Sequence, residues 1–239
     1  MSIARGDHHV HSTFSDDAVS TIAENIVAAA EAGLGTLRLI DHVRDTTEWV
    51  PEFLAAVAAE PVPVGLTVLT GVETKMMDTS GRLDLPPGLE AGRDGLDVIV
   101  IADHQFPGPD GPWSPSATIE RLEGGLATEA ALDQLIDAYV NAMDGVAAGQ
   151  LAHPFSILPK VGLSEDDLSD AQLERFAAAV ARTGTLVEVN EKWACPGPRV
   201  LRAVLDAGGE IVAATDSHDA RDVGSYTKVL AMLGEVGLR

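Results

Sequence analysis

The feature of this sequence that most constrains its fold is a regular alternation of short apolar runs with helical patterns. Several runs are almost continuously apolar, as is typical of parallel strands that are buried on both faces. The seven expected strands span residues 2–11, 36–43, 66–75, 96–106, 149–155, 185–193 and 210–218. The expected helices span residues 21–33, 48–60, 127–149, 170–184, 198–209 and 222–236. This order predicts a parallel α/β architecture.

The length and cysteine usage of the chain bound its class. It has 239 residues, of which 46% are hydrophobic, and α/β barrels of this size are routinely one unit. We therefore expect a single barrel domain over residues 1–239. No apolar run approaches the ~18 residues of a membrane helix, and no apolar signal segment is visible. The one cysteine, Cys195, fits a reducing cytosol. We expect a cytoplasmic protein without a membrane partner; the oligomeric state stays open.

The charge of the chain argues against a long nucleic acid as its partner. Asp and Glu number 37 against 16 Lys and Arg, which gives a net charge of −21. Such a field repels polyanions. A protein that follows DNA typically neutralises ~6–10 phosphates with basic residues, and no basic cluster here could do so. We therefore expect a small substrate.

Six of the seven histidines fall at the C-terminal ends of expected strands. They are His9, His11, His42, His104, His153 and His218. The C-terminal ends of parallel barrel strands meet at one mouth, where the active sites of such barrels lie. The third strand offers no histidine but ends with Glu73, and the last strand also carries Asp216. We expect these side chains to converge.

Strand spacing and ligand chemistry turn this convergence into a prediction of a metal site. Residues two apart in a strand face the same side, so His9 should lie beside His11 while His8 points away. The same rule brings Asp216 and His218 together. Imidazole and carboxylate groups suit Zn, Mn or Fe. With an acid from the segment FSDD there are about nine donors, more than the three protein ligands of one catalytic metal. We therefore expect two to three divalent transition metals.

At these positions the chain resembles the PHP family, named for its polymerase and histidinol-phosphatase members. The family pattern begins with D-x-H-x-H-S/T and an acid or histidine. It continues with D-H, G-x-E and two single histidines, and it ends with D-x-H. Here the motifs read in order as DHHVHS, FSDD, IDH, GVE, ADH, AHP and TDSH. All nine ligand positions of the family are filled, and the combination is specific although each motif alone is weak.

The resemblance implies a distorted (β/α)7 barrel, similar to a TIM barrel, with three metals at the C-terminal strand ends. The first metal would be held by His9, His11, Glu73 and Asp216, the second by Glu73, His104 and His153, and the third by Asp16, His42 and His218. Glu73 would bridge two ions, and the catalytic residues would be Glu73, Asp16 and His218. Asp17 competes with Asp16 for its position, and the spacing in the family favours Asp16.

Candidate substrate contacts come from the loops after the strands. The region before the last strand is similar to histidinol-phosphatase-type members, which commonly carry Glu-x-Asn; here these are Glu188 and Asn190. Both could support ligands, contact substrate or be ordinary polar groups of a strand. Those members often follow the Asn with small residues, whereas EKW follows here. The candidate substrate-binding residues are Arg44, Lys75, Asn190, Lys192 and Arg221.

A multinuclear site of this kind predicts hydrolysis of a phosphate ester. Water between two cations loses a proton near neutral pH and becomes a positioned hydroxide, and the cations neutralise charge on the phosphoryl oxygens and the leaving group. We expect a phosphoric monoester hydrolase that acts on a small phosphorylated metabolite through a hydroxide bridging metals of the trinuclear site. Histidinol phosphate is the first candidate.

Several alternatives stay open. A nucleotide phosphodiesterase or 3′-5′ exonuclease of the same family would use the same ligands. An amidohydrolase would have eight strands and commonly a lysine ligand on the fourth strand, where this chain has ADHQF. A non-catalytic, metal-binding regulatory barrel would usually have lost donors. The loops 78–88 and 107–116, rich in Pro and Gly, are either plain connections or rims and lids of a pocket.

Overall fold

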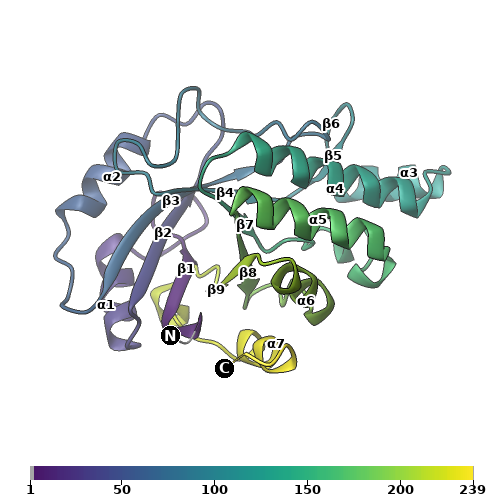
Figure 1. Ribbon diagram of the computed structural model, residues 1–239. Coiled ribbons are helices and arrows are strands. Elements are labelled where there is room, and N and C mark those ends of the chain that lie inside the picture. Colours follow the sequence, from purple (N-terminus) through teal and green to yellow (C-terminus); the bar gives the residue numbers. More distant parts are fainter. Residues whose placement is uncertain (1–2, 239) are drawn as a thin grey trace.

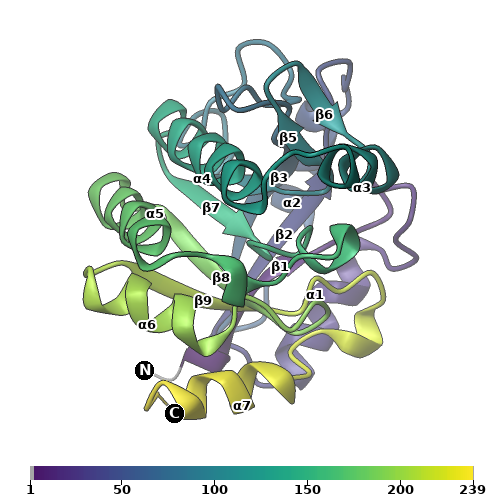
Figure 2. The same cartoon turned by 90° about the vertical axis from the view of Figure 1, so that its right-hand side faces the viewer.

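Seven parallel strands form the frame of the protein in a computed structural model that describes residues 3–238. They are hydrogen-bonded in chain order. These strands are β1 (Gly6–Val10), β2 (Thr36–His42), β3 (Thr67–Lys75), β4 (Val98–Ala102), β7 (Gly149–Ala152), β8 (Leu186–Asn190) and β9 (Glu210–Ala214). The sheet curls until β1 and β9 lie side by side (Figures 1 and 2), and the His11 N–H there donates to the Ser217 carbonyl at 2.8 Å. The fold is the expected distorted, nearly closed (β/α)7 barrel.

Helices connect most of the strands and lie outside the sheet (Figure 2). They are α1 (Ile22–Glu31), α2 (Val50–Ala59), α3 (Pro115–Glu123), α4 (Thr128–Gly145), α5 (Asp170–Thr183), α6 (Pro198–Asp206) and α7 (Lys228–Glu235). All but α3 correspond to helices expected from the sequence. The connection from β3 to β4 contains no helix over residues 76–97. Within residues 3–238, no helix combines the length and the apolar character that crossing a membrane requires.

Local signals fix the ends of these helices. The Thr21 hydroxyl accepts from the Glu24 N–H at 3.2 Å, and the Glu24 carboxylate accepts from the Thr21 N–H at 2.8 Å, which forms the expected capping box of α1. Gly184 caps the C-terminal end of α5, and its φ of +67° is the left-handed conformation that favours glycine at a helix end.

The observed strands are shorter than the expected ones, because several expected strands include the turns that follow them. After β4 ends at Ala102, residues 106–108 form β5 (Phe106–Gly108), which pairs in antiparallel fashion with β6 (Gly111–Trp113). The segment 107–116 is therefore a hairpin that leads into α3. For this segment to be a lid, its residues would have to contact the site. At the start of the chain, residues 3–5 form a 3₁₀ turn, and residue 2 lies outside the described residues.

A bulge interrupts the regular pairing of β1 with β2. Asp7 pairs with Leu37 and Val10 with Leu39, so β1 carries one residue more than β2 between these pairs. Strict alternation, the basis for expecting His8 to point away, therefore does not hold here. The ring of His8 lies against Gly6, where an added Cβ would come within 2.4 Å of His8 Nε2. His8 thus lies toward the start of β1, away from the C-terminal strand ends.

The register of the sheet brings the polar residues of the mouth onto one face. His42 pairs with Glu73, and Glu73 with Val100, so all three point to the same side of the sheet. A small apolar cluster packs on the strands that carry these polar residues: Ile40, Val98, Val100, Ala102 and Ala152. The site therefore rests on a packed interior.

Candidate metal centre

The carboxylate of Glu73, at the end of β3, is the centre of the site. Glu73 is 1% exposed, and neither of its oxygens has a hydrogen-bond partner of good geometry among the described residues. Five imidazole nitrogens surround it, those of His42 at 2.9 Å, His104 at 3.0 Å, His153 at 3.2 Å, His9 at 3.4 Å and His11 at 3.6 Å. Two ligands that share one ion, each about 2.1 Å from it, lie roughly 3 to 3.5 Å apart. The spacing therefore fits metal ligands.

The two oxygens of Glu73 face different histidines. Oε1 lies near the Nε2 atoms of His104 and His153, whereas Oε2 lies near His9, His11 and His42. A carboxylate with ligands on both sides can bridge two ions. The donor set therefore suits more than one metal.

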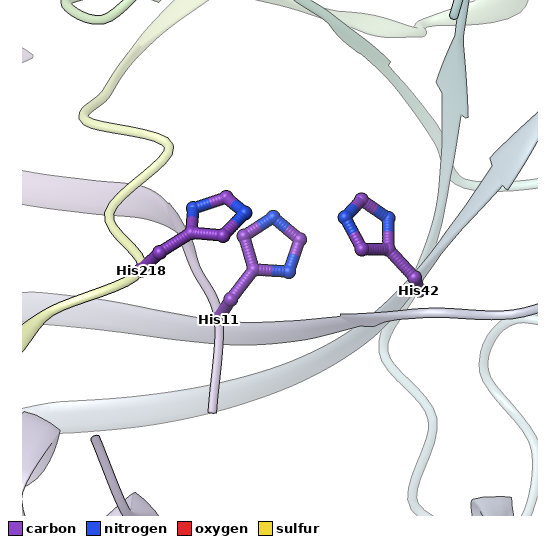
Figure 3. A group of neighbouring side chains, drawn as sticks. All are labelled: His11, His42 and His218. Atoms are coloured by element: carbon purple, nitrogen blue, oxygen red, sulfur yellow. The ribbon is translucent and has the colours of Figure 1, made fainter. Parts of the chain in front are cut away.

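In each of three groups of residues, the donor atoms lie within 4.8 Å of one another. They are His11, His42 and His218; His9, His11 and Glu73; and His42, Glu73 and His104. Figure 3 shows the first group, in which side chains from the ends of β1 and β2 and from the loop after β9 turn toward one another. These residues are far apart in the sequence, and the C-terminal strand ends bring them together.

Asp216 completes the site from the loop after β9. Its Oδ1 lies 3.3 Å from His11 Nε2 and 3.6 Å from His218 Nδ1. Burial alone would raise its pKa, but a hydrogen bond with His11 and the nearby charge of His9 hold the pKa well below the usual range. Its φ of +55° lies in the left-handed region, a strained conformation for a non-glycine residue that is typical of functional sites.

Of the two neighbouring aspartates in FSDD, Asp17 is the one whose carboxylate meets histidines. Its Oδ2 lies 3.2 Å from His218 Nε2 and 3.7 Å from His42 Nε2. Asp16 lines the same cavity. The contacts with His218 and His42 thus belong to Asp17, the competitor, and not to the expected Asp16.

Burial and nearby charges shift the pKa values of several candidate ligands, among them His11, His153 and Glu73. Burial lowers the pKa of His11 to about 3, which keeps this imidazole neutral and able to bind a cation. Burial also acts to lower the pKa of His153, but hydrogen bonds to Asp103 and Glu73 outweigh it and raise the pKa to about 10. Burial would raise the pKa of Glu73, yet the neighbouring charges of His104 and His9 hold it well below its ordinary value.

A second row of buried carboxylates holds the candidate ligands in place. Glu188 accepts from His9 Nδ1 at 2.7 Å, from Gln150 Nε2 at 2.7 Å, from Asn190 Nδ2 at 3.0 Å and from the backbone N–H of His153 at 3.1 Å. One carboxylate thus fixes ligands on two strands. Such outer partners set the tautomer and orientation of metal-binding imidazoles.

The aspartates that precede ligand histidines have the same supporting role, which the sequence analysis missed. Asp41 accepts from the hydroxyls of Ser12 at 2.6 Å and Ser15 at 2.7 Å, and Ser15 Oγ in turn accepts from the His42 N–H at 3.0 Å. The recurrence of Asp directly before His in IDH and ADH was the available signal.

Asp103 supports the opposite side of the site. Its carboxylate accepts from Ser156 Oγ at 2.7 Å and from the Tyr139 hydroxyl at 2.9 Å, and its Oδ1 lies 3.5 Å from His153 Nδ1. The Tyr139 ring packs edge-on against Phe155 and Phe176 in the layer between barrel and helices. Packing outside the barrel therefore orients a ligand inside it.

Asp7 closes the barrel beneath the site. Its carboxylate accepts from Thr215 Oγ1 at 2.6 Å, from the Thr215 N–H at 3.0 Å and from the Gly224 N–H at 2.9 Å. Burial raises the pKa of Asp7 to about 6. These bonds join β1 to the segments after β9, where the sheet has to meet itself.

A cavity of about 430 Å³ opens over the donors. Its lining includes the expected substrate-binding residues Arg44, Lys75 and Lys192, together with Asp84, Gln105 and Trp193. Lys75 Nζ donates to Gln105 Oε1 at 3.0 Å, and Lys192 Nζ lies 3.6 Å from Asp216 Oδ1. Three cations therefore surround the donors in an otherwise acidic chain.

Two other candidates for substrate contact lie elsewhere. Asn190 is completely buried and donates to Glu188, so it belongs to the support of the ligands. Arg221 is 87% exposed and pairs with Asp219, outside the residues that line the cavity. Asn190 and Arg221 also lie near strand ends in the sequence, so their positions did not distinguish them from Arg44, Lys75 and Lys192, which line the cavity.

The two loops singled out in the sequence differ in their relation to the site. Asp84, from segment 78–88, lines the cavity. Within residues 107–116, none lines it, and Trp113 stacks on Phe106 with ring centroids 5.9 Å apart. The first loop thus forms part of the rim, while the hairpin packs on its own residues.

A parallel barrel with a buried histidine and carboxylate cluster at its C-terminal strand ends defines the class of this protein. The chain belongs to the PHP domain family, whose model matches residues 7–192.

Curated relatives match nearly the whole chain at low identity. A "Probable phosphatase" of Shewanella sediminis is 26% identical, over 96% of this chain and 84% of the relative. "Probable phosphatase Teth514_1060" of Thermoanaerobacter sp. is 24% identical, over 97% of this chain and 86% of the relative. Among solved structures, histidinol phosphate phosphatase of Lactococcus lactis, complexed with Zn, L-histidinol and phosphate, is similar with a TM-score of 0.59. It is 14% identical, over 98% of this chain and 94% of that one. This structural similarity supports the fold.

Proposed function

We propose that this chain is a metal-dependent phosphomonoesterase that acts on a small phosphorylated metabolite, with histidinol phosphate as the first candidate. The observation that carries the proposal is the buried carboxylate of Glu73, whose two oxygens lack hydrogen-bond donors of good geometry and face five imidazoles. An ionised carboxylate is costly to bury without compensating charge. Metal ions between Glu73 and the histidines would provide that charge.

The donors divide into three proposed ligand sets. The first is His9, His11, Glu73 and Asp216; the second is Glu73, His104 and His153; the third is His42, His218 and Asp17, with Asp16 as the alternative. Zn, Mn or Fe suits such nitrogen and oxygen donors. Bound ions would lower the pKa of water and stabilise charge on the phosphoryl group.

The residues of the cavity would bind and orient the phosphate ester. Arg44, Lys75 and Lys192 line it, and their charges would contact phosphoryl oxygens that the metals leave free. Glu188 and Asp103 would keep His9 and His153 in the orientation that metal binding needs. This chain therefore supplies both the ligands and the cations that a phosphomonoester requires.

Four observations support a small monoester as substrate. The curated relatives carry the name "Probable phosphatase", and the similar Lactococcus lactis structure contains L-histidinol and phosphate. The cavity of about 430 Å³ fits a small metabolite. The net charge of −21 opposes a long polyanion.

The test is a comparison of kcat/KM on metal-reconstituted protein for histidinol phosphate, a sugar phosphate, AMP and a single-stranded oligonucleotide. We expect phosphate release from a monoester with the highest value, and loss of that activity in Glu73→Gln, which excludes a contaminating phosphatase. The highest value for the oligonucleotide would establish the exonuclease alternative. A metal-loaded protein inactive on all phosphate esters would favour the non-catalytic barrel.

A further inference from the structure

The segment after β8 departs from the family pattern and joins three parts of the molecule. The Glu191 carboxylate accepts from the N–H groups of Thr227, Lys228 and Val229 at 2.9 to 3.0 Å, and so holds the start of α7. Lys192 Nζ lies 3.3 Å from His218 Nδ1. The third residue of the segment, Trp193, reaches a candidate ligand directly.

Trp193 is held on several sides. Its indole N–H donates to Asp216 Oδ2 at 2.8 Å, and its backbone N–H donates to Asn190 Oδ1 at 3.1 Å. Lys160 Nζ lies 4.0 Å from the centre of the ring, a cation–π contact. The backbone just after the indole is constrained too, since Ala194 has a φ of +54°. The direction of the indole N–H is therefore fixed by its surroundings.

The hydrogen bond from Trp193 gives the two oxygens of Asp216 different partners. Oδ2 accepts from Trp193, whereas Oδ1 lies 3.3 Å from His11 Nε2 and 3.6 Å from Lys192 Nζ. Only Oδ1 thus faces the other donors of the site. The side chain is 5% exposed, so little solvent is available to replace the indole N–H if it is removed.

We propose that Trp193 is a positioning residue that holds Asp216 as a one-oxygen ligand of the metal centre. The inference rests on the proposed metal centre and adds to it the residue that sets the ligand geometry of Asp216. Without the indole N–H, the Asp216 carboxylate is free to rotate or to present both oxygens to one ion. Either change alters the coordination of the ion that His9, His11 and Glu73 share with Asp216.

Trp193 also separates two cavities. It lines the cavity of about 430 Å³ over the donors and a neighbouring one of about 440 Å³, which Pro159, Lys160 and Glu165 help to form. Trp193→Ala removes this wall together with the hydrogen bond, so it cannot separate the two effects. Trp193→Phe removes the N–H and keeps a smaller aromatic ring as the wall, so it disturbs the wall far less than Trp193→Ala does.

The experiment compares Trp193→Phe with Trp113→Phe. Trp113 is a matched control, because its indole N–H also donates to an aspartate, Asp110, at 2.5 Å, outside the cavity residues. For each protein we would measure metal content after titration with a chelator, kcat and KM on the best substrate, and the thermal midpoint. We expect Trp193→Phe to lose one ion at about 10- to 100-fold lower chelator concentration, the range for outer ligand partners. Its kcat should fall while KM and the thermal midpoint change little.

The outcomes separate this inference from the proposed function. If wild-type protein binds metal and Trp193→Phe retains it as firmly as Trp113→Phe does, with an unchanged kcat, the positioning role of Trp193 is refuted and the metal centre stands. If wild-type protein takes up no metal from Zn²⁺, Mn²⁺ or Fe²⁺ solutions, both proposals fail. If Trp193→Phe changes KM alone, Trp193 acts as a wall and not through Asp216.

Discussion

His9 and Glu188 lie on the first and sixth strands of the barrel, and their side chains meet at 2.7 Å between His9 Nδ1 and Glu188 Oε1. Because a carboxylate accepts, Nδ1 carries the proton, and Nε2 lies 3.4 Å from Glu73 Oε2 and 3.0 Å from His11 Nε2. The same carboxylate also accepts from the backbone of His153. One buried group thereby sets the orientation of ligands on both sides of Glu73.

Glu188→Gln should weaken metal binding, although Glu188 is not itself one of the proposed ligands. In the wild type, four donors converge on the two oxygens of the Glu188 carboxylate. The amide of Gln has only one acceptor oxygen, so at least one buried donor loses its partner. We expect metal affinity or kcat to fall by about 10- to 100-fold, measured by chelator competition and steady-state kinetics. Unchanged metal affinity in a folded variant would show that Glu188 only stabilises the strand.

The sequence predicts the frame and the donors of this site for a simple reason. Buried parallel strands have a local signature, and parallel strand ends must meet at one edge, so His42, Glu73 and His104 are expected to converge without any knowledge of tertiary contacts. The structure places their side chains around one carboxylate. Strand periodicity and chain order are sufficient for this part.

Where periodicity is broken, the sequence does not determine the direction of a side chain. Asp16 and Asp17 lie in a turn over residues 13–17, which has no repeating pattern to indicate which one faces His218. The bulge in β1 likewise interrupts the alternation from which the direction of His8 was predicted. The bond between Trp193 and Asp216 depends on how two loops pack. These features need the folded chain.

Removing the charge of Glu73 should affect turnover far more than removing the ring of His8. Glu73 lies among five imidazoles, so Glu73→Gln disturbs every ion it contacts, and kcat should fall by more than about 100-fold, beyond the loss for an outer partner. His8 is half-buried beside Gly6, so His8→Ala should lower stability and leave kcat nearly unchanged. Steady-state kinetics and thermal unfolding check both. Equal losses of kcat would contradict this assignment.

The two neighbouring aspartates can be separated by a pair of isosteric substitutions. Wild-type protein prepared without chelator should contain two to three transition-metal ions per chain by elemental analysis. Because Asp17 Oδ2 lies 3.2 Å from His218 Nε2, Asp17→Asn should lose one ion, while Asp16→Asn should retain all of them. The reverse result would restore Asp16 as the ligand. A wild-type content at or below one ion in metal-replete buffer would refute the trinuclear centre.

Glu165 should make the stability of the protein depend on pH. Burial, helped by the negative charges of Asp166 and Asp103, raises its pKa to about 7, against 4.5 for an ordinary Glu, although the Gly197 N–H bonded to it at 2.8 Å acts the other way. An acid whose pKa is raised by folding contributes stability that is complete below pH about 4.5 and is lost as the pH rises through about 7.

Glu165→Gln keeps an acceptor for Gly197 and cannot ionise, so it isolates this contribution. Between pH 5 and pH 8, the free energy of unfolding of the wild type should fall relative to that of the variant, by at most roughly 3 kcal/mol. Urea unfolding of both proteins at a series of pH values measures the difference. Parallel pH profiles for the two proteins would mean that the Glu165 carboxyl ionises in the folded protein as it does in the unfolded chain.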